Sequence, residues 1–273
     1  MITEKFQDWM KNKYNLMERT LLSYRRVIER FFVEYDEPTI ENINKFITSS
    51  TEKSNSFYIK YAFRYYLEFI GKGDDYKLIK KIKQRPRKRV GVYVDSVKLV
   101  NLVNAIENPT HRVVAIIQYL TGARTGDVLR LSIDNVKAND DSSLSLTLDV
   151  KGGKKHTVFI PIKYSFRIAQ FIKTRGKKYP FLESLSSDIT KSIDTNYRYY
   201  YNSIKKAAFN VDLPDFQPHD FRRNFLEDVF ESTNDIRIAQ NLAGHSNITY
   251  TMKYIKSKET EEKLRKVAES VRG

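Results

Sequence analysis

The first 70 residues alternate between apolar and polar positions with the period of an α-helix. Two stretches place apolar side chains three and four residues apart, which puts them on one helical face. These positions are Phe6, Trp9 and Met10 in the first stretch and Leu21, Tyr24, Val27, Ile28 and Phe31 in the second. Further helices are expected over residues 39–48 and 55–70, and Gly71-Lys72-Gly73 predicts a stop. The pattern predicts an all-helical N-terminal domain over residues 1–75.

The period of the pattern changes once in the second half of the chain. Helices are expected over residues 95–107 and 110–122, and a short one should follow Arg124. Leu144, Leu146 and Leu148 then alternate with polar residues, as Thr157, Phe159 and Pro161 do after Gly152-Gly153, and this predicts a two-residue hairpin. Helical spacing returns over residues 163–175, 191–209, 219–232, 235–244, 248–255 and 258–271. We expect a mostly α fold with one small antiparallel sheet, and a second domain over residues 95–273.

A basic segment separates the two predicted domains. Residues 76–94 contain no acidic residue, and Pro86 would interrupt a helix, so we interpret the segment as an interdomain linker. Its candidate DNA-binding residues are Lys80, Lys81, Lys83, Arg85, Arg87, Lys88 and Arg89. Such a charge run is either simply solvated or a strap along DNA phosphates, where released counterions would give affinity without sequence preference.

The composition of the chain indicates the class of its binding partner. The chain of 273 residues has a formal net charge of +15 with 41% hydrophobic residues, so a globular core carries a strongly basic surface. The usual partner of such a surface is a polyanion, most often nucleic acid, although a generally basic proteome would also explain the charge. The chain has no cysteine, which excludes disulfides and cysteine-ligated metals. Its N-terminus has no apolar signal core and no stretch is long enough to span a membrane, so we expect a cytoplasmic protein.

Four separated segments carry candidate chemistry. Arg124 lies in Thr121-Gly122-Ala123-Arg124-Thr125-Gly126-Asp127, and Lys151 and Lys154 flank the two glycines of the hairpin. His219-Asp220-Phe221-Arg222 begins a helix after Pro218, and Gly244-His245 precedes Tyr254 by nine residues. Each segment alone has a structural explanation: a capping arginine, a solvated turn lysine, a buried histidine, one tyrosine among 18.

Taken together in this order, the segments resemble the tyrosine recombinase family of site-specific recombinases and phage-type integrases. The family pattern is an arginine, a hairpin lysine, His-x-x-Arg, Gly-His, and a tyrosine nine residues beyond that histidine. It falls here on Arg124, Lys151, His219, Arg222, His245 and Tyr254. The resemblance covers nearly the whole chain. It implies a helical, SAM-like core-binding domain followed by an α/β catalytic domain with a C-terminal helix.

Three positions depart from the family pattern. Asp127 stands where glutamate is common, as a supporting carboxylate for the first arginine. Ala243 stands where leucine usually precedes Gly-His, and Arg223 where histidine is frequent. None of these removes a reacting group, but together they weaken assignment to a particular subfamily.

The resemblance implies cleavage and rejoining of DNA through Tyr254, which attacks phosphorus and leaves a 3′-phosphotyrosyl bond and a free 5′-hydroxyl. Arg124 and Arg222 would clamp the non-bridging oxygens, because guanidinium offers phosphate a permanently charged fork of donors. His219 would be the general base, Lys151 the general acid, and His245 a donor to a phosphate oxygen. Neither a cofactor, a metal nor ATP is needed. Tyr250, four residues before Tyr254, could compete for its role.

The same resemblance sets expectations about partners. Double-stranded DNA is the expected ligand, with Lys154, Arg198 and Lys205 as further contacts. A homo-oligomer, a tetramer on paired sites, is the expected assembly, and its C-terminal helix packs either on a neighbour or on its own domain. A type IB topoisomerase and a noncatalytic DNA-binding protein are the alternatives. An RNA-binding protein would explain the charge but not the six residues.

Overall fold

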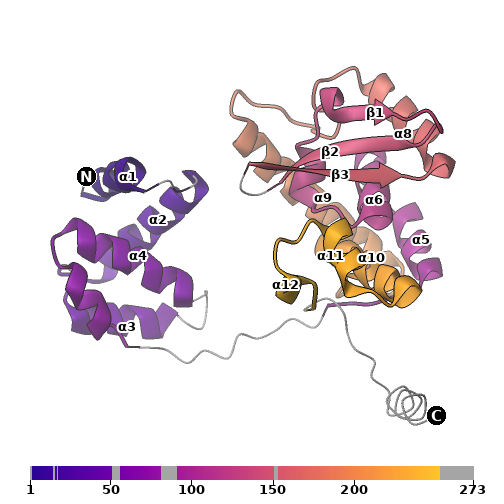
Figure 1. Ribbon diagram of the computed structural model, residues 1–273. Helices are drawn as coiled ribbons and strands as arrows, with labels where there is room; N and C mark the ends of the chain where they lie inside the picture. The colour runs from indigo at the N-terminus through magenta and orange to yellow at the C-terminus, as the bar shows by residue number, and fades with distance from the viewer. Residues whose placement is uncertain are drawn as a thin grey trace, which may run out of the picture. The chain divides into compact units, whose positions relative to one another are not determined.

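The structure is a computed structural model that describes residues 2–14, 16, 18–50, 56–80, 91–150 and 153–252. The chain divides into two compact units, residues 1–88 and 89–273 (Figure 1). Both ends of the predicted linker pack on a unit, since Ile79 is buried in the first core and Val94 in the second. The linker residues between them, 81–90, lie outside the described residues.

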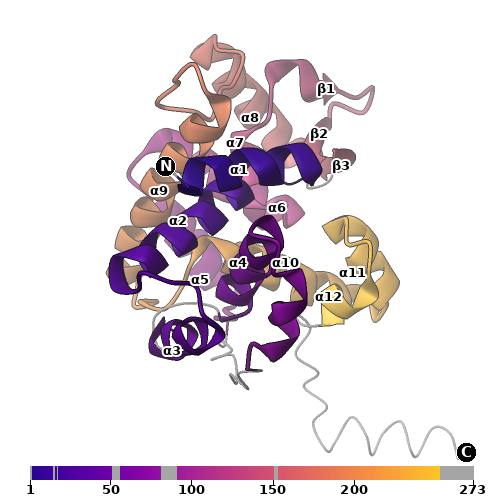
Figure 2. The same ribbon diagram turned by 90° about the vertical axis from the view of Figure 1, so that its left-hand side faces the viewer.

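The first unit is helical, as the periodicity predicts. It contains α1 (Ile2–Lys13), α2 (Glu18–Glu34), α3 (Ile40–Ser50), α4 (Ser56–Phe69) and a 3-10 helix, η1 (Gly73–Leu78). Helices α1 and α3 lie at opposite ends of this unit, with α2 and α4 between them (Figure 2). At its centre Phe31 meets Phe46 and Phe63 edge to face, with ring centroids 5.4 and 5.1 Å apart. Aromatic packing of this geometry adds to simple apolar burial.

In the second unit, helices pack against a small sheet. Its helices are α5 (Ser96–Asn104), α6 (Pro109–Thr121), α7 (Thr125–Leu129), η2 (Ile133–Asn135), α8 (Ile162–Arg175), α9 (Ile189–Asn210), α10 (Pro218–Thr233), α11 (Ile236–Ala243) and α12 (Ile248–Met252). The mostly α fold with a small antiparallel sheet is confirmed. The helix expected over residues 258–271 lies outside the described residues.

The sheet has three antiparallel strands in the order β1 (Val136–Ala138), β2 (Leu144–Val150) and β3 (Lys154–Ile160). The sequence did not predict β1. The alternating leucines of β2 are buried, as expected for a strand with one face on the core. Strands β2 and β3 pair as far as Val150 opposite Lys154, so three residues connect them. The predicted two-residue turn was therefore wrong by one residue.

Helix α6 is the element that positions the site. It begins at the Asn108 cap followed by Pro109, and it ends at Gly122 in the left-handed conformation. It packs against α5, α7, α10 and β3, between the sheet and α10 in Figure 1. Its C-terminus therefore holds the loop with Arg124 beside the start of α10, where His219 and Arg222 lie.

Candidate active site

Helix α6 ends at Gly122, and Arg124 lies in the short loop that connects it to α7. Gly122 has φ +64°, and a Cβ on it would lie 2.3 Å from the Phe225 ring of α10. Glycine is therefore required both for the backbone conformation and for the close approach of the two elements. Arg124 follows in extended conformation as the N-cap residue of α7, with its side chain 39% exposed.

Asp127, the supporting carboxylate that the sequence suggested, lies beside this arginine. Its carboxylate is 8% exposed and lies 3.6 Å from Nη1 of Arg124 and 3.4 Å from Nη2 of Arg130. Burial raises the pKa of Asp127, while the charges of Arg124, Arg130 and Arg222 lower it, and burial is the larger effect. The carboxylate accordingly faces three guanidinium groups, and the site keeps an excess of positive charge.

Arg222 is buried on α10, with 2% of its surface exposed. Its Nη1 donates to the carbonyl oxygen of Gly122 at 2.7 Å, and its Nη2 donates to that of Ala243 at 2.6 Å. Nη2 also lies 2.8 Å from Nε2 of His245. One side chain thus joins the loop after α6 to the loop after α11, across 100 and 21 residues of sequence.

The protonation of His245 follows from these partners. A guanidinium nitrogen can only donate, so Nε2 of His245 accepts, and the neutral ring carries its proton on Nδ1. Nδ1 lies 3.0 Å from Oγ1 of Thr251, to which it donates. Burial, and then the charges of Arg222 and Arg124, lower the pKa of His245 to about 4. His245 is therefore neutral at ordinary pH and orients Arg222 in this state.

His219 is the second residue of α10 and remains exposed at the surface. The protein atoms around its ring still desolvate the imidazole, and with the charge of Arg222 they lower its pKa to about 4. Arg223 and Arg124 lower the pKa further, whereas Asp220 raises it. A neutral imidazole among arginines is a proton acceptor available at neutral pH.

These observations bring five of the predicted site residues together: Arg124, Asp127, His219, Arg222 and His245. Lys151 and Tyr254 lie outside the described residues. The described neighbours of both are nevertheless attached to the site. Thr251, three residues before Tyr254, contacts His245, and His156 of β3 lies 3.0 Å from the Leu242 carbonyl oxygen, one turn before His245.

The glycine before His245 allows the sheet to approach this closely. Gly244 has φ +63°, and a Cβ on it would lie 3.1 Å from the His156 ring. The Gly-His pair of the family pattern thus has a local physical reason here. The glycine ends α11 in the left-handed conformation and leaves room for β3.

The predicted DNA contacts are scattered. Lys154 and Arg198 are exposed, at the start of β3 and on α9. Lys205 donates to the Pro214 carbonyl oxygen. Lys80 is exposed in the first unit, where its backbone N–H donates to the Asn44 side chain. The six remaining candidates, Lys81, Lys83, Arg85, Arg87, Lys88 and Arg89, lie outside the described residues.

Sequence reasoning missed the residues whose hydrogen bonds position the candidate catalytic side chains. Thr251 carries one such contact; Gln118 and Tyr200, described below, carry others. Contacts between positions far apart along the chain leave no local pattern. Only the place of Thr251, between His245 and Tyr254, could have suggested a role for it.

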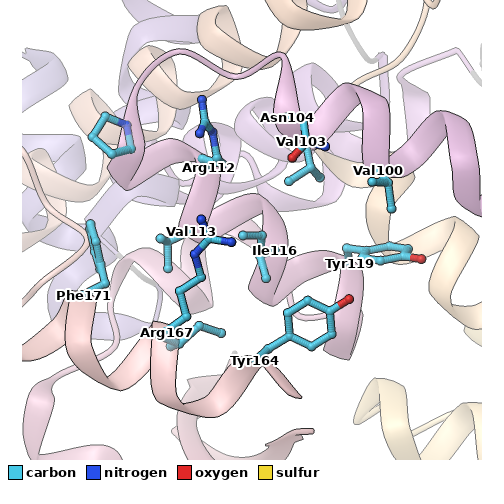
Figure 3. A pocket seen from close by; sticks show the side chains of 12 residues that line it. Val100, Val103, Asn104, Arg112, Val113, Ile116, Tyr119, Tyr164, Arg167 and Phe171 are labelled. Carbon is cyan, nitrogen blue, oxygen red and sulfur yellow. The ribbon is translucent and has the colours of Figure 1, made fainter. Parts of the chain in front are cut away.

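A separate hollow of about 300 Å³ lies between α5, α6 and α8 (Figure 3). It is mainly apolar, with Arg112 and Arg167 at its wall, and none of the predicted catalytic residues lines it. Among the described residues, no three His, Asp or Glu side chains gather as they would around a metal ion. None of the helices in the described ranges is both long and apolar enough to cross a membrane.

The phage integrase family model matches residues 93–261, which is most of the chain and includes the whole site. The chain belongs to the phage integrase family. Its relatives include tyrosine recombinase XerA of Pyrococcus horikoshii, 25% identical over 275 residues, which cover 99% of this chain and 93% of the relative. Another is tyrosine recombinase XerD of Haemophilus ducreyi, 25% identical, with 93% of this chain and 92% of the relative covered.

Solved structures share the fold at lower identity. The integrase of transposon Tn1549, in complex with a circular intermediate DNA, is 14% identical with a TM-score of 0.68, and 98% of this chain and 99% of that one are covered. A lambda integrase tetramer bound to a Holliday junction is also 14% identical, with a TM-score of 0.66 and coverage of 94% and 76%.

Proposed function

We propose that this protein is a site-specific DNA recombinase that cleaves and rejoins strands through Tyr254. The observation that carries the proposal is the gathering of Arg124, Arg222, His219 and His245 from distant segments into one basic site. Its position beside the β2–β3 hairpin and α12 adds support, since these two elements lead to Lys151 and Tyr254 in the sequence.

The proposed reaction is a transesterification at a DNA phosphodiester. The Tyr254 oxygen forms a bond to phosphorus, and the bond from phosphorus to the 5′-oxygen breaks. His219 accepts the phenol proton, and Lys151 gives a proton to the leaving 5′-oxygen. A 5′-hydroxyl then attacks the phosphotyrosyl bond in the reverse sense. One phosphoester replaces another at each step, so the reaction needs no external energy source.

Arg124 and Arg222 would stabilise the charge that collects on the non-bridging oxygens. The contacts around Arg222 support this role, because they fix the position of its guanidinium. His245 has both ring nitrogens engaged in this state, with Arg222 and Thr251. We therefore propose that His245 orients Arg222, a role that stands beside the donation to phosphate that the sequence suggested.

The partners follow from the charge and from the relatives. Double-stranded DNA is the proposed ligand, contacted by the linker lysines and arginines, Lys154, Arg198 and Lys205. Structural relatives bound to DNA as dimers and tetramers support a tetramer on paired sites. The division into a core-binding domain over 1–75, a linker over 76–94 and a catalytic domain over 95–273 is part of this proposal, as is action in the cytoplasm.

Covalent capture tests the proposal. Pooled duplexes with nicks near each potential cleavage position would be mixed with protein, because a nick lets the short 5′-hydroxyl fragment diffuse away and traps the adduct. After denaturation, the attached DNA is sequenced. We expect a 3′-linked adduct with the wild type and none with Tyr254→Phe.

Tyr250→Phe is the matched control, since Tyr250 lies on α12 with 53% of its surface exposed. It should keep the adduct. Retention of the adduct in Tyr254→Phe together with its loss in Tyr250→Phe would move the nucleophile to Tyr250. DNA binding by the wild type with no adduct would favour a noncatalytic DNA-binding protein.

A further inference from the structure

Gln118 is a buried amide in the last turn of α6, with 1% of its surface exposed. Its Nε2 donates to the carbonyl oxygen of Ala123 at 3.1 Å and to Oγ1 of Thr125 at 3.0 Å. These two acceptors belong to the residues immediately before and after Arg124. One side chain therefore binds the main chain just before the candidate clamp and the side-chain hydroxyl of the residue just after it.

The orientation of this amide is fixed by its partners. The Ala123 carbonyl oxygen can only accept, so the NH₂ group of Gln118 faces it and both of its hydrogens are used. The Gln118 oxygen accepts a 2.5 Å hydrogen bond from the Tyr200 hydroxyl of α9. Burial raises the pKa of Tyr200 well above its ordinary value, so the hydroxyl keeps its proton and remains a donor.

Arg124 needs such a support because its own side-chain contact is loose. The distance of 3.6 Å to Asp127 exceeds that of a hydrogen bond, and 39% of the side chain is exposed. The backbone at 123–125 fixes the point from which the Arg124 side chain extends, and Gln118 contacts the residues on both sides of that point. A displacement of about 1 Å at a catalytic group can lower a rate roughly 100-fold.

We propose that Gln118, held by Tyr200, is a positioning residue that fixes Arg124 against the scissile phosphate. The inference rests on the proposed function, since it assigns Gln118 an effect only through the arginine clamp. Helix α9 also contributes to this positioning, through the Tyr200 hydroxyl, which lies 82 residues from Gln118 in the sequence.

The test compares two substrates built on the DNA site that covalent capture returns. One carries the natural phosphate, and the other carries a methylphosphonate at the scissile position, where a neutral methyl replaces a charged oxygen. Loss of that charge removes most of the need for an aligned guanidinium. With Gln118→Leu we expect adduct formation on the phosphate to fall roughly 10- to 100-fold, and the methylphosphonate rate to stay within about 3-fold of the wild type, since the clamp matters little there.

Two further variants separate positioning from folding. Asn196→Leu removes another buried amide, whose hydrogen bonds go to residues 183, 184 and 192 and not to the Arg124 loop. It should lower the melting temperature and leave the ratio of the two rates unchanged. Tyr200→Phe removes a single hydroxyl, and it should lower the phosphate rate about 2- to 10-fold, the range that one neutral hydrogen bond supports.

The Arg124→Ala background gives the decisive comparison. There the Gln118 substitution should have no further effect on the phosphate rate. Equal losses on both substrates, or an undiminished loss in the Arg124→Ala background, would overturn the inference and leave Gln118 a structural residue. If Gln118→Leu does not fold, Tyr200→Phe carries the same comparison. Absence of any adduct with the wild type would instead overturn the proposed function, and the inference with it.

Discussion

Substitution of Gly122 by alanine tests how closely α6 and α10 approach at the site. Gly122 and Gly176 both end a helix in the left-handed conformation, with φ +64° and +58°. They differ in their surroundings: a Cβ at 122 would lie 2.3 Å from Phe225, whereas nothing lies within 4 Å of a Cβ at 176. Gly176→Ala is thus a matched control for the backbone conformation alone.

The expected magnitudes follow from this difference. A left-handed alanine costs about 1–2 kcal/mol at either position. At 122 the added carbon is roughly 1.5 Å closer to the ring than the ordinary contact of about 3.8 Å, and overpacking of this kind costs about 1–3 kcal/mol more. We expect Gly176→Ala to lower the free energy of unfolding by about 1–2 kcal/mol, and Gly122→Ala by about 2–5 kcal/mol.

Urea unfolding measures both values, provided that the two units are followed separately. The single tryptophan, Trp9, lies in the first unit, so its fluorescence should give the same midpoint in every variant. Far-ultraviolet circular dichroism then reports the shift of the second unit. In the Phe225→Ala background the extra cost at 122 should vanish and only the backbone cost should remain. An equal cost at 122 and 176 in the wild-type background would refute the reasoning.

Three further predictions concern charge and protonation at the site. Because the pKa values of His219 and His245 are lowered to about 4 from 6.5, folding stability should be full above about pH 6.5 and decline between pH 6.5 and 4. Adduct formation at limiting DNA should stay level down to about pH 5, and an acid limb near 6.5 would show that at least one of the two histidines has an ordinary pKa. Thr251→Val removes the acceptor of the His245 Nδ1–H and should slow adduct formation roughly 10-fold, which is within the cost of a buried donor left unsatisfied. Thr251→Ser keeps the hydroxyl and should keep the rate, so equal rates for the two variants would show that the hydroxyl is not needed. Lys154→Ala should reduce the slope of log K for DNA binding against log salt concentration by about 1. Lys206→Ala should change the slope less, because the Lys206 ammonium already pairs with the Glu107 carboxylate. An unchanged slope for Lys154→Ala would exclude Lys154 from the phosphate contacts.

The helices could be predicted from the sequence because they leave a local pattern, and the candidate site residues could be selected for the same reason. Apolar spacing gives the period of α2 and α6, and Arg124, His219, Arg222 and His245 occur in short motifs. The strand β1 has only three residues, too few to show an alternating pattern. The connection between β2 and β3 was predicted one residue too short, because the glycine pair marks a turn without fixing which residues on either side pair.

The contacts around the site could not be predicted, because they join positions distant in sequence. The tautomer of His245 depends on Arg222 and Thr251, which approach from α10 and α12. The support of Arg124 depends on an amide in α6 and a hydroxyl in α9. A motif names the groups that can react, whereas tertiary packing decides their protonation and direction.

The hydrogen-bond acceptors of the Arg222 guanidinium also affect which sequence changes the site can accept. Two of them are main-chain oxygens, at Gly122 and Ala243, and every residue type offers the same oxygen at a given position. The alanine at 243, where leucine is usual in the family, therefore leaves the anchoring of the guanidinium untouched. At position 243, unlike at Gly122, the side chain can therefore change while the acceptor of the Arg222 guanidinium stays the same, as long as the turn keeps its conformation.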